Sequence, residues 1–345
     1  MPPLPSPSTI HVLGGGAIGL LVAGHLLKVR VPVRLHLRRP PLAAGTTPLT
    51  LTEAWKGDGG GSVPQSLECP VEGAGMGGGP IDCLVVATKA QQARRAIEPL
   101  CPRLTERSKV LFLQNGLGVY EDVVKLWERE GESRGRPRPI FLLGTTTHGA
   151  YRPVLTAEGE DHGRSVVHAG QGRMWVGAAS ARDDHSSELQ EWVEVLSARV
   201  PDLALDPTLQ GAQDMQDRLV EKLAVASIIL PLTALSGQKN GDILSPPLEG
   251  LAKDLAKEVS KVLTQAGYPR MLPSWVEERV KAVARETREN ISSMRADIEA
   301  GRRTEVEFIC GAIIRMAREK GLPTPLLDML QGLIEARSKL FKSDT

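Results

Sequence analysis

The sequence predicts an α/β fold in which a doubly wound sheet is followed by an all-helical C-terminal domain, and two observations carry this prediction. Over the first half of the chain, short apolar runs alternate with helical stretches, which is typical of a parallel sheet covered by helices. Beyond Pro207, helical periodicity continues to the end. At about 150 residues per domain, the 345 residues suffice for two domains, which we place at residues 1–207 and 208–345.

The first half supplies the expected strands. Residues 10–13 form a short apolar run, and the stretch 17–28 that follows has apolar residues at helical spacing. Further strands are expected at residues 31–37, 81–87, 110–113 and 139–143, and Val166, Met174 and Val176 are expected to pair in a hairpin. Residues 57–80 and 128–138 are rich in Gly, Pro or charge, so we expect surface loops there.

The second half is predicted to be helical at residues 215–235, 248–266, 275–300, 305–320 and 325–341. Its longest apolar run, 223–235, is shorter than the roughly 20 residues that a membrane helix needs, and it contains Pro231. The sequence therefore predicts no membrane span.

Charge and cysteine content argue against several classes of function. Lys and Arg number 42 and Asp and Glu 41, so the net charge of +1 gives no electrostatic reason to bind nucleic acid or an anionic membrane. The cysteines, Cys69, Cys83, Cys101 and Cys310, show no C-x-x-C spacing and no accompanying histidine cluster, so no metal site is expected. Few cysteines and a Pro-rich start without targeting features favour the reducing cytoplasm.

A glycine-rich turn directly follows the first strand and opens the first helix. It reads Gly14, Gly15, Gly16, Ala17, Ile18 and Gly19, which is a G-x-G-x-x-G pattern. The first glycine permits a tight turn, the second lets a pyrophosphate approach the backbone, and the third lets helix and strand pack closely. In this strand–turn–helix context, the pattern predicts a Rossmann-type dinucleotide site rather than a ligand-free turn.

The residues at the end of the second strand indicate which nicotinamide cofactor the chain binds. Enzymes that use NAD usually place an acidic residue there, whereas this chain has Arg38 and Arg39 after Leu37. Guanidinium groups favour the 2′-phosphate of NADP(H), which a carboxylate would repel. The alternative is that one of the two arginines is only a solvated surface charge.

Several further segments complete a resemblance to the ketopantoate reductase (2-dehydropantoate 2-reductase) family, and they occur in family order over nearly the whole chain. They are Ala87-Thr88-Lys89-Ala90, Gln114-Asn115-Gly116-Leu117-Gly118, Gly144-Thr145-Thr146-Thr147-His148, Lys222-Leu223-Ala224-Val225, Pro231-Leu232-Thr233-Ala234, Asn240-Gly241-Asp242, Asn290-Ile291-Ser292-Ser293-Met294 and Arg303-Thr304-Glu305.

The resemblance implies NADPH-dependent reduction of a 2-oxo acid to a 2-hydroxy acid, with 2-dehydropantoate, a precursor of pantothenate, as the expected substrate. It also implies the roles of individual residues. Lys222 would donate the proton; Lys89, Asn115, Ala150 and Glu305 would contact the cofactor; Asn240, Asn290 and Ser293 would hold the substrate.

The residues support two of these roles directly. Lys222 lies among apolar helix residues, where desolvation lowers the pKa of an ammonium and makes it a better acid near neutrality. The alternative is a lysine that extends from an amphipathic helix to water. Asn290 and Ser293 are three residues apart, so within the predicted helix they would share one face. Glu305 follows Thr304, a good N-cap, so a favourable place in a first helical turn is an alternative to cofactor contact.

The chain also departs from the family pattern. The family has asparagines four and eight residues after the lysine and another near the C-terminus, where this chain has Ala226, Leu230 and Cys310. Three hypotheses remain open: a ketopantoate reductase, a paralogue that reduces a less polar 2-oxo acid, and a non-catalytic NADP-binding scaffold. A homodimer is compatible with each.

Overall fold

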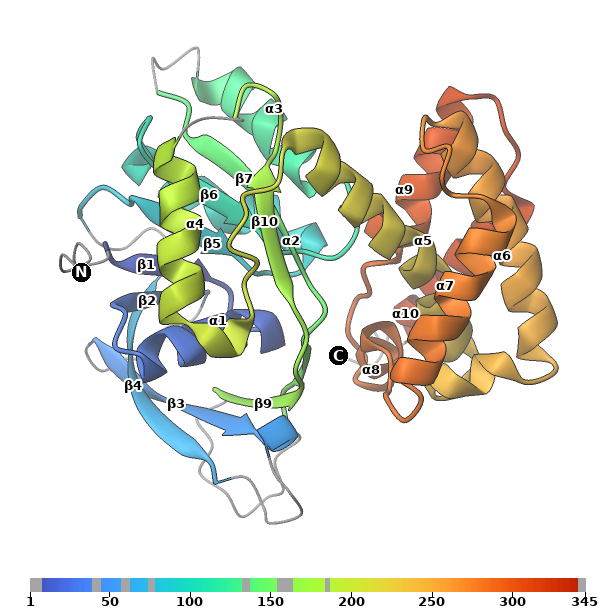
Figure 1. Cartoon of the computed structure of the whole chain (residues 1–345), viewed down its shortest axis with the longest axis horizontal. Coiled ribbons are helices and arrows are strands. Elements are labelled where there is room, and N and C mark those ends of the chain that lie inside the picture. Colours follow the sequence, from blue (N-terminus) through green and yellow to red (C-terminus); the bar gives the residue numbers. More distant parts are fainter. Residues whose placement is uncertain are drawn as a thin grey trace. The chain divides into compact units, whose positions relative to one another are not determined.

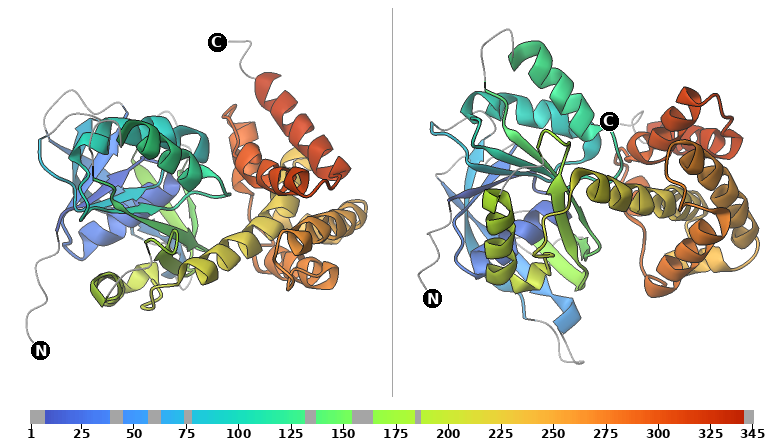
Figure 2. Two further views of the ribbon diagram at one scale, coloured as in Figure 1. Left: turned by 90° about the horizontal axis from the view of Figure 1, so that it is seen from above. Right: turned by 45° about the horizontal axis from the view of Figure 1, so that its top comes forward.

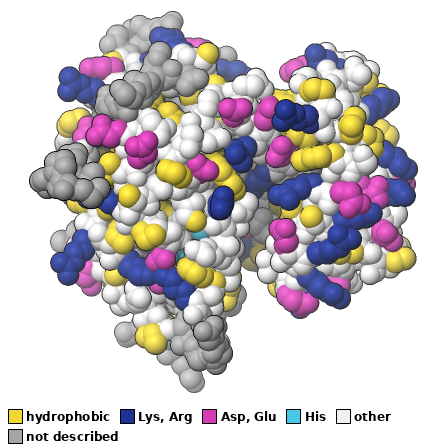
Figure 3. All heavy atoms as spheres, viewed as in Figure 1, with side chains coloured by type: hydrophobic (Ala, Val, Ile, Leu, Met, Phe, Trp, Pro, Cys, Tyr) yellow, Lys and Arg dark blue, Asp and Glu magenta, His cyan; other side chains and the backbone are white. Residues whose placement is uncertain are grey.

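The computed structural model describes residues 8–38, 45–56, 63–73, 78–131, 137–153, 164–183 and 187–340 (Figure 1). It divides the chain into two compact units: residues 1–114 with 119–216, and residues 115–118 with 217–345. The first unit contains the sheet and the second is helical, so the predicted fold class is confirmed. On the face seen in Figure 3, described basic and acidic side chains are interspersed, in keeping with the net charge of +1.

A ten-stranded sheet runs through the described part of the first unit, in the spatial order β10-β7-β6-β5-β1-β2-β4-β3-β9-β8. The strands are β1 (Ile10–Leu13), β2 (Val33–Leu37), β3 (Thr46–Glu53), β4 (Gln65–Gly73), β5 (Cys83–Val86), β6 (Lys109–Phe112), β7 (Ile140–Thr146), β8 (Gly149–Tyr151), β9 (Ser165–Gly170) and β10 (Met174–Ala178). The central strands from β7 to β4 are parallel, and Ile10 of β1 is in register with Val33 and Cys83 on its two sides. β1 and β5 are buried at every position, which explains why they are apolar throughout except for His11 of β1.

Helices cover both faces of this sheet (Figure 2). They are α1 (Ala17–Lys28), α2 (Ala90–Ile97), α3 (Val119–Gly131) and α4 (Ser187–Arg199), with the short 3₁₀ helices η1 (Ala54–Lys56), η2 (Glu98–Arg103) and η4 (Pro201–Leu203). α1 and α4 share one apolar core with β1, β2 and β3; Leu20, Leu189 and Leu49 are among its buried residues.

The second unit is built from six described helices around its own apolar core. They are α5 (Ala212–Ser236), α6 (Leu248–Gln265), α7 (Pro273–Glu286), α8 (Ser293–Glu299), α9 (Val306–Glu319) and α10 (Pro325–Leu340), with the 3₁₀ helix η5 (Asn240–Leu244). Within the described residues, α5 alone is long and apolar enough to cross a membrane by length and composition. Two thirds of its most apolar window is buried inside the protein, as expected for a core helix, so this is weak support for a span.

Four sequence predictions are wrong, and the first two concern loops. The predicted loop 57–80 contains β4, because Cys69 and Val71 alternate into the core and the strand pairs with β2 on one side and β3 on the other. The expected loop 128–138 begins inside α3, which continues to Gly131. Residues 57–62, 74–77 and 132–136 lie outside the described part.

The predicted hairpin around Val166 and Met174 does not form, because β9 pairs with β3 and β8 whereas β10 pairs with β7, near the opposite edge of the sheet. The single helix predicted for residues 275–300 is two helices. α7 ends at Glu286, and Ser292 caps α8 by accepting a hydrogen bond from the Arg295 backbone N–H.

Candidate active site

The glycine-rich turn has the close packing that its sequence requires. Gly14 has a φ of +119°, and a Cβ there would lie 2.8 Å from the Thr88 backbone nitrogen. A Cβ on Gly19 would lie 2.0 Å from the Gly14 carbonyl oxygen. Gly16 is the N-cap of α1 and provides no side-chain cap, so the first backbone N–H groups of the helix face outward from the turn. This arrangement is typical of a pyrophosphate cradle.

The turn lies where the strand order reverses, between β2 and β5 on the two sides of β1. Its position is fixed by backbone hydrogen bonds from Gly14 to the His36 carbonyl (3.2 Å) and from Ala87 to the Leu13 carbonyl (2.9 Å). In open α/β sheets, ligands bind at such a switch point.

Two predicted cofactor residues follow these neighbouring strands. Arg38 comes directly after β2 and is exposed, and Lys89 is the N-cap of α2 after β5. Arg39 lies outside the described residues. Thr88 is a further candidate that was not predicted, although it lies in the Ala87–Ala90 motif: its Oγ1 is buried and has no hydrogen-bond partner among the described residues.

Ala150 lies on β8, which packs against α1, where a bulge interrupts its pairing with β9. His148, just before β8, is fixed by hydrogen bonds to the Leu203 carbonyl (2.8 Å) and from the Gly172 N–H (2.9 Å). These hydrogen bonds of His148 therefore hold the backbone two residues before Ala150 in place. The first unit thus contains the glycine turn, Arg38, Lys89 and Ala150.

The helical unit contains the predicted proton donor. Lys222 lies on α5 and is half-buried. Desolvation lowers the pKa of its ammonium to about 8, while the negative charge of the buried Glu305 opposes this shift. A lysine with this pKa is protonated at neutral pH and still releases its proton readily.

Asn115 belongs to the helical unit although it lies between β6 and α3 in the chain. The residues that follow it lie against α9, and Leu117 is hydrogen-bonded to that helix. Leu117 donates to the Phe308 carbonyl (2.9 Å), and Gly116, with a φ of +84°, lies so close that a Cβ would meet the same oxygen at 2.2 Å. Arg315 donates to the Leu117 carbonyl at 3.3 Å. The backbone after Asn115 is therefore held in place by α9.

The structure brings together two of the three predicted substrate residues. The Asn240 N–H donates to the Asn290 carbonyl (3.1 Å), and the Asn240 amide nitrogen donates to Thr287 Oγ1 (3.0 Å). Asn240 Oδ1 is buried and has no partner among the described residues. Asn290 and Ser293 are both exposed, but they do not share a helical face, since Asn290 precedes α8 and Ser293 is its first residue.

The apolar substitutions on α5 lie on the helical core, and the neighbouring Ser227 does not replace the missing amides. Ala226 and Leu230 pack against the helical core. Ser227 is fully buried and its hydroxyl donates to the Ala224 carbonyl of its own helix (2.9 Å). Cys310 is also buried, its thiol is directed at the Ser227 carbonyl, and burial raises its pKa to about 12, so it is an inert core thiol.

Glu305 is the N-cap residue of α9 and makes no side-chain cap hydrogen bond there. Thr304, which the sequence predicted as the cap, lies one residue earlier, and its Oγ1 accepts only a long 3.5 Å contact from the Val306 N–H. The carboxylate of Glu305 therefore does not cap the helix, and its negative charge raises the pKa of Lys222.

A dinucleotide cradle at the switch point of an α/β sheet, together with a helical unit that holds a lysine of lowered pKa, is typical of nicotinamide-dependent oxidoreductases. Comparison with known proteins makes this specific. The family described as Ketopantoate reductase PanE/ApbA matches residues 10–181, and the one described as its C terminal matches residues 214–338. The chain belongs to the ketopantoate reductase family.

Individual relatives agree. The chain is 30% identical to the 2-dehydropantoate 2-reductase of Vibrio cholerae over 92% of this chain and 93% of that protein. It is also 30% identical to the enzyme of that name from Bacillus subtilis, over 95% and 96%.

Solved structures share the fold. A 2-dehydropantoate 2-reductase from Geobacter metallireducens matches with a TM-score of 0.73 and 22% identity over 95% of this chain and 99% of that one. A D-mandelate dehydrogenase complex with NADH and anilino(oxo)acetate matches with a TM-score of 0.74 and 18% identity over 97% and 100%. A ketopantoate reductase from Staphylococcus aureus, described as dimeric, matches with a TM-score of 0.68 and 20% identity over 97% and 100%.

Proposed function

We propose that the chain is an NADPH-dependent reductase of 2-oxo acids that works in the cytoplasm, with 2-dehydropantoate as the substrate to test first. The observation that carries the proposal is Lys222, whose lowered pKa gives the family's expected proton donor the right chemistry at neutral pH. In this proposal residues 1–207 bind the cofactor and residues 208–345 bind the substrate. As in the dimeric Staphylococcus aureus relative, the chain would form a homodimer, which light scattering would test.

The residues of the first unit fit NADP(H). The Gly14–Gly19 turn admits a pyrophosphate because side chains are excluded there, and the orphaned Thr88 hydroxyl offers a polar contact beside it. The exposed Arg38 would hold the 2′-phosphate, and Lys89 and the Ala150 backbone would contact the rest of the cofactor. From the helical unit, Asn115 and Glu305 would add further contacts. When bound, NADPH supplies the hydride.

Lys222 has two tasks in this mechanism. Its ammonium stabilises the negative charge that develops on the ketone oxygen, and it then gives that oxygen a proton. Asn240 Oδ1, buried and without a described partner, is available to accept a hydrogen bond from substrate, while Asn290 and Ser293 present polar groups to the carboxylate. These tasks need only groups that the chain itself supplies.

A second candidate function has a specific basis. Ala226 and Leu230 present apolar groups one and two turns beyond Lys222, where hydrogen-bonding amides would favour a polar substrate. A 2-oxo acid with an apolar side chain fits this wall better than ketopantoate does.

One experiment separates the candidates. NADPH oxidation is followed with ketopantoate, with a branched aliphatic 2-oxo acid and with phenylglyoxylate at equal concentrations. The highest kcat/KM for ketopantoate supports the first proposal, and the highest kcat/KM for either apolar acid supports the second. Binding of NADPH without turnover of any of the three would support a non-catalytic protein instead.

A further inference from the structure

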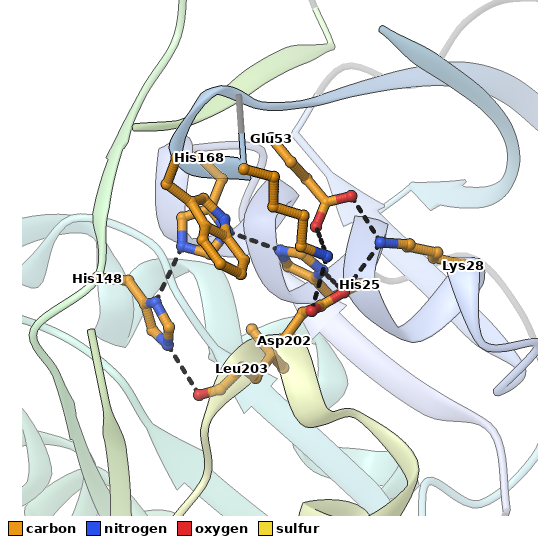
Figure 4. Close-up of polar contacts among 9 residues, drawn as sticks. His25, Lys28, Glu53, His148, His168, Asp202 and Leu203 are labelled. Atoms are coloured by element: carbon orange, nitrogen blue, oxygen red, sulfur yellow. Dashed lines mark hydrogen bonds and ion pairs between the residues drawn. The ribbon is translucent and has the colours of Figure 1, made fainter. Parts of the chain in front are cut away.

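A cluster of polar side chains, partly buried, lies at the C-terminal end of α1, at the opposite end of the helix from the glycine turn. It joins His25 and Lys28 of α1 to Glu53 at the end of β3, Lys56 of η1 and Asp202 of η4 (Figure 4). The proposed reaction uses none of these residues. The sequence predicted no metal site because the cysteines have no C-x-x-C spacing and no histidine cluster accompanies them, but the fold brings His25 close to Glu53 and Asp202.

Hydrogen bonds fix where the protons lie on the three linked imidazoles of His148, His168 and His25. The Leu203 carbonyl can only accept, so His148 carries its proton on Nε2, and its Nδ1 accepts from the Gly172 N–H. The indole N–H of Trp55 donates to His168 Nδ1 (2.9 Å), so the proton of His168 is on Nε2, which lies 3.0 Å from His148 Nδ1.

His25 completes this chain. Its Nε2 lies 3.0 Å from His168 Nδ1, which carries no proton, so a proton on His25 Nε2 avoids repulsion between two lone pairs (Figure 4). A neutral His25 then has a bare lone pair on Nδ1. Burial lowers the pKa of His25 to about 4, so the imidazole is neutral at ordinary pH.

That lone pair lies beside carboxylates. His25 is 1% exposed, and its Nδ1 makes no hydrogen bond with any described residue. Asp202 Oδ2 is 3.9 Å away, and one ligand atom each from His25, Glu53 and Asp202 all lie within 4.8 Å of one another. Two acceptors cannot form a hydrogen bond with each other, but ligands of one transition-metal ion, each at about 2.0–2.2 Å from it, are roughly 3–4 Å apart.

We propose that His25 Nδ1, Glu53 and Asp202 form a binding site for a divalent first-row transition-metal ion. One imidazole and two carboxylates are a donor set suited to Zn²⁺, Co²⁺ or Mn²⁺. The site joins α1 to β3 and η4, so its bound ion stabilises the first unit and does not take part in the reduction.

Two lysines hold the carboxylates when no such ion is bound. Lys28 Nζ is 2.6 Å from Glu53 and 2.9 Å from Asp202, and Lys56 Nζ is 2.7 Å and 2.8 Å from the other oxygens of the same two residues. Their side chains are 25% and 38% exposed, so both ammonium groups can turn to water while their stems stay packed. The metal ion therefore competes with two ammonium groups, so removal of one of these groups should strengthen metal binding.

The test is a Co²⁺ titration of the full, untagged chain, followed by visible absorption and by thermal unfolding. We expect one Co²⁺ per chain and a rise in Tm, because the ion binds only the folded state. His25→Gln and Asp202→Asn should each weaken binding at least about tenfold, since even outer-shell changes commonly cost roughly 10–100-fold.

Lys28→Met provides a test that does not depend on damaging a ligand. It removes a competing cation, so Co²⁺ should bind several-fold more tightly, whereas Lys261→Met, on the exposed face of α6, should change nothing. Unchanged or weaker binding in Lys28→Met would overturn the proposal.

A second buried group, His11, His36 and Glu72, could bind metal in place of the proposed site. Loss of Co²⁺ binding in His11→Gln, with binding retained in His25→Gln, would move the ion there and overturn the proposal. So would the absence of saturable Co²⁺ binding to the unmutated chain.

Discussion

A 2.7 Å hydrogen bond joins the hydroxyl groups of Thr233 on α5 and Ser292 at the N-cap of α8. Both side chains are buried, and Ser292 also accepts from the Arg295 N–H at 3.2 Å. Asn290 lies two residues before Ser292 and Ser293 directly after it, so this bond fixes the segment that presents both proposed substrate ligands. It links them to the helix that bears Lys222.

Thr233→Val should therefore lower the stability of the helical unit and raise the KM for the 2-oxo acid. The valine keeps the shape but leaves the buried Ser292 hydroxyl short of a partner, which costs about 1–3 kcal/mol in unfolding free energy. Urea unfolding and steady-state kinetics measure the two effects. Ser236→Ala is the matched control, because that hydroxyl makes only local bonds: it donates to the Leu232 carbonyl of its own helix and accepts from the nearby Gln238 N–H. Equal effects of the two changes on KM would contradict the assigned role.

Lys222→Met should lower kcat by at least about a hundredfold, the usual scale for loss of a positioned acid. Methionine preserves most of the side-chain volume, so NADPH binding, measured by fluorescence titration, should change little. Lys261→Met serves as the control on an exposed helix face. Normal turnover of the Lys222 variant would show that Lys222 is not the proton donor and serves only in packing.

The lowered pKa of Lys222 predicts how activity depends on pH. The ammonium form is the proton donor, so kcat/KM for reduction should fall as the pH rises through about 8, with NADPH saturating. Glu305 raises this pKa, and Glu305→Gln should therefore move the decline to lower pH. Glu307→Gln, two residues along and exposed, should leave the profile in place. If kcat/KM declines at the same pH in both variants as in the unmutated chain, then Glu305 does not influence the pKa of the proton donor.

Arg38→Ala should reduce the preference for NADPH over NADH by about 10–100-fold, because hydrogen bonds to a charged phosphate are each worth roughly 1.5–3 kcal/mol. The dissociation constants of the two cofactors, measured by fluorescence, test this directly. The affinity for NADH should be nearly constant, and Arg94→Ala on the exposed side of α2 should alter neither cofactor. Equal affinities for NADPH and NADH in the unmutated chain would refute the choice of cofactor.

Restoring amides on α5 tests the apolar wall. Ala226→Asn combined with Leu230→Asn should raise kcat/KM for ketopantoate, by about fivefold for each hydrogen bond of roughly 1 kcal/mol that forms. The same change should lower kcat/KM for phenylglyoxylate. Circular dichroism must show that the helix is retained, since both residues pack against the core. A gain for phenylglyoxylate would contradict the assignment of this wall to the substrate.

The first unit was largely predictable where local and tertiary signals agree. The helix expected at residues 17–28 matches α1 from Ala17 to Lys28, because the glycine turn, the apolar spacing and the flanking strands indicate the same element. β4 was missed because Gly-rich flanks dominate the composition around it, and its pairing with β2 and β3 is a long-range property. Likewise, Val166 and Met174 look like hairpin partners locally, but sheet order separates them.

The site could be predicted as a set of residues but not as a geometry. The family motifs named Lys222 and Asn240, whereas only the fold shows that Ser292, not its neighbour Ser293, is buried against Thr233. Periodicity alone carried a helix through residues 287–292, because no proline or glycine marks the break there. The second helix begins where it does because Ser292 caps it with a side-chain hydrogen bond. The joined histidines were unpredictable for a similar reason: His25 and His168 are 143 residues apart.

Residues 115–118 have a consequence for how the two halves of this chain can be separated. They precede α3 in sequence, yet they belong with α9, to which the bond from Leu117 to Phe308 ties them. A gene cut near residue 217 would give an N-terminal piece that carries this tetrapeptide without its partner helix, and a C-terminal piece whose Phe308 carbonyl lacks its donor. The helical half therefore cannot be exchanged between relatives by recombination near residue 217 alone. A chimaera must take residues 115–118 and residues 217–345 from the same parent.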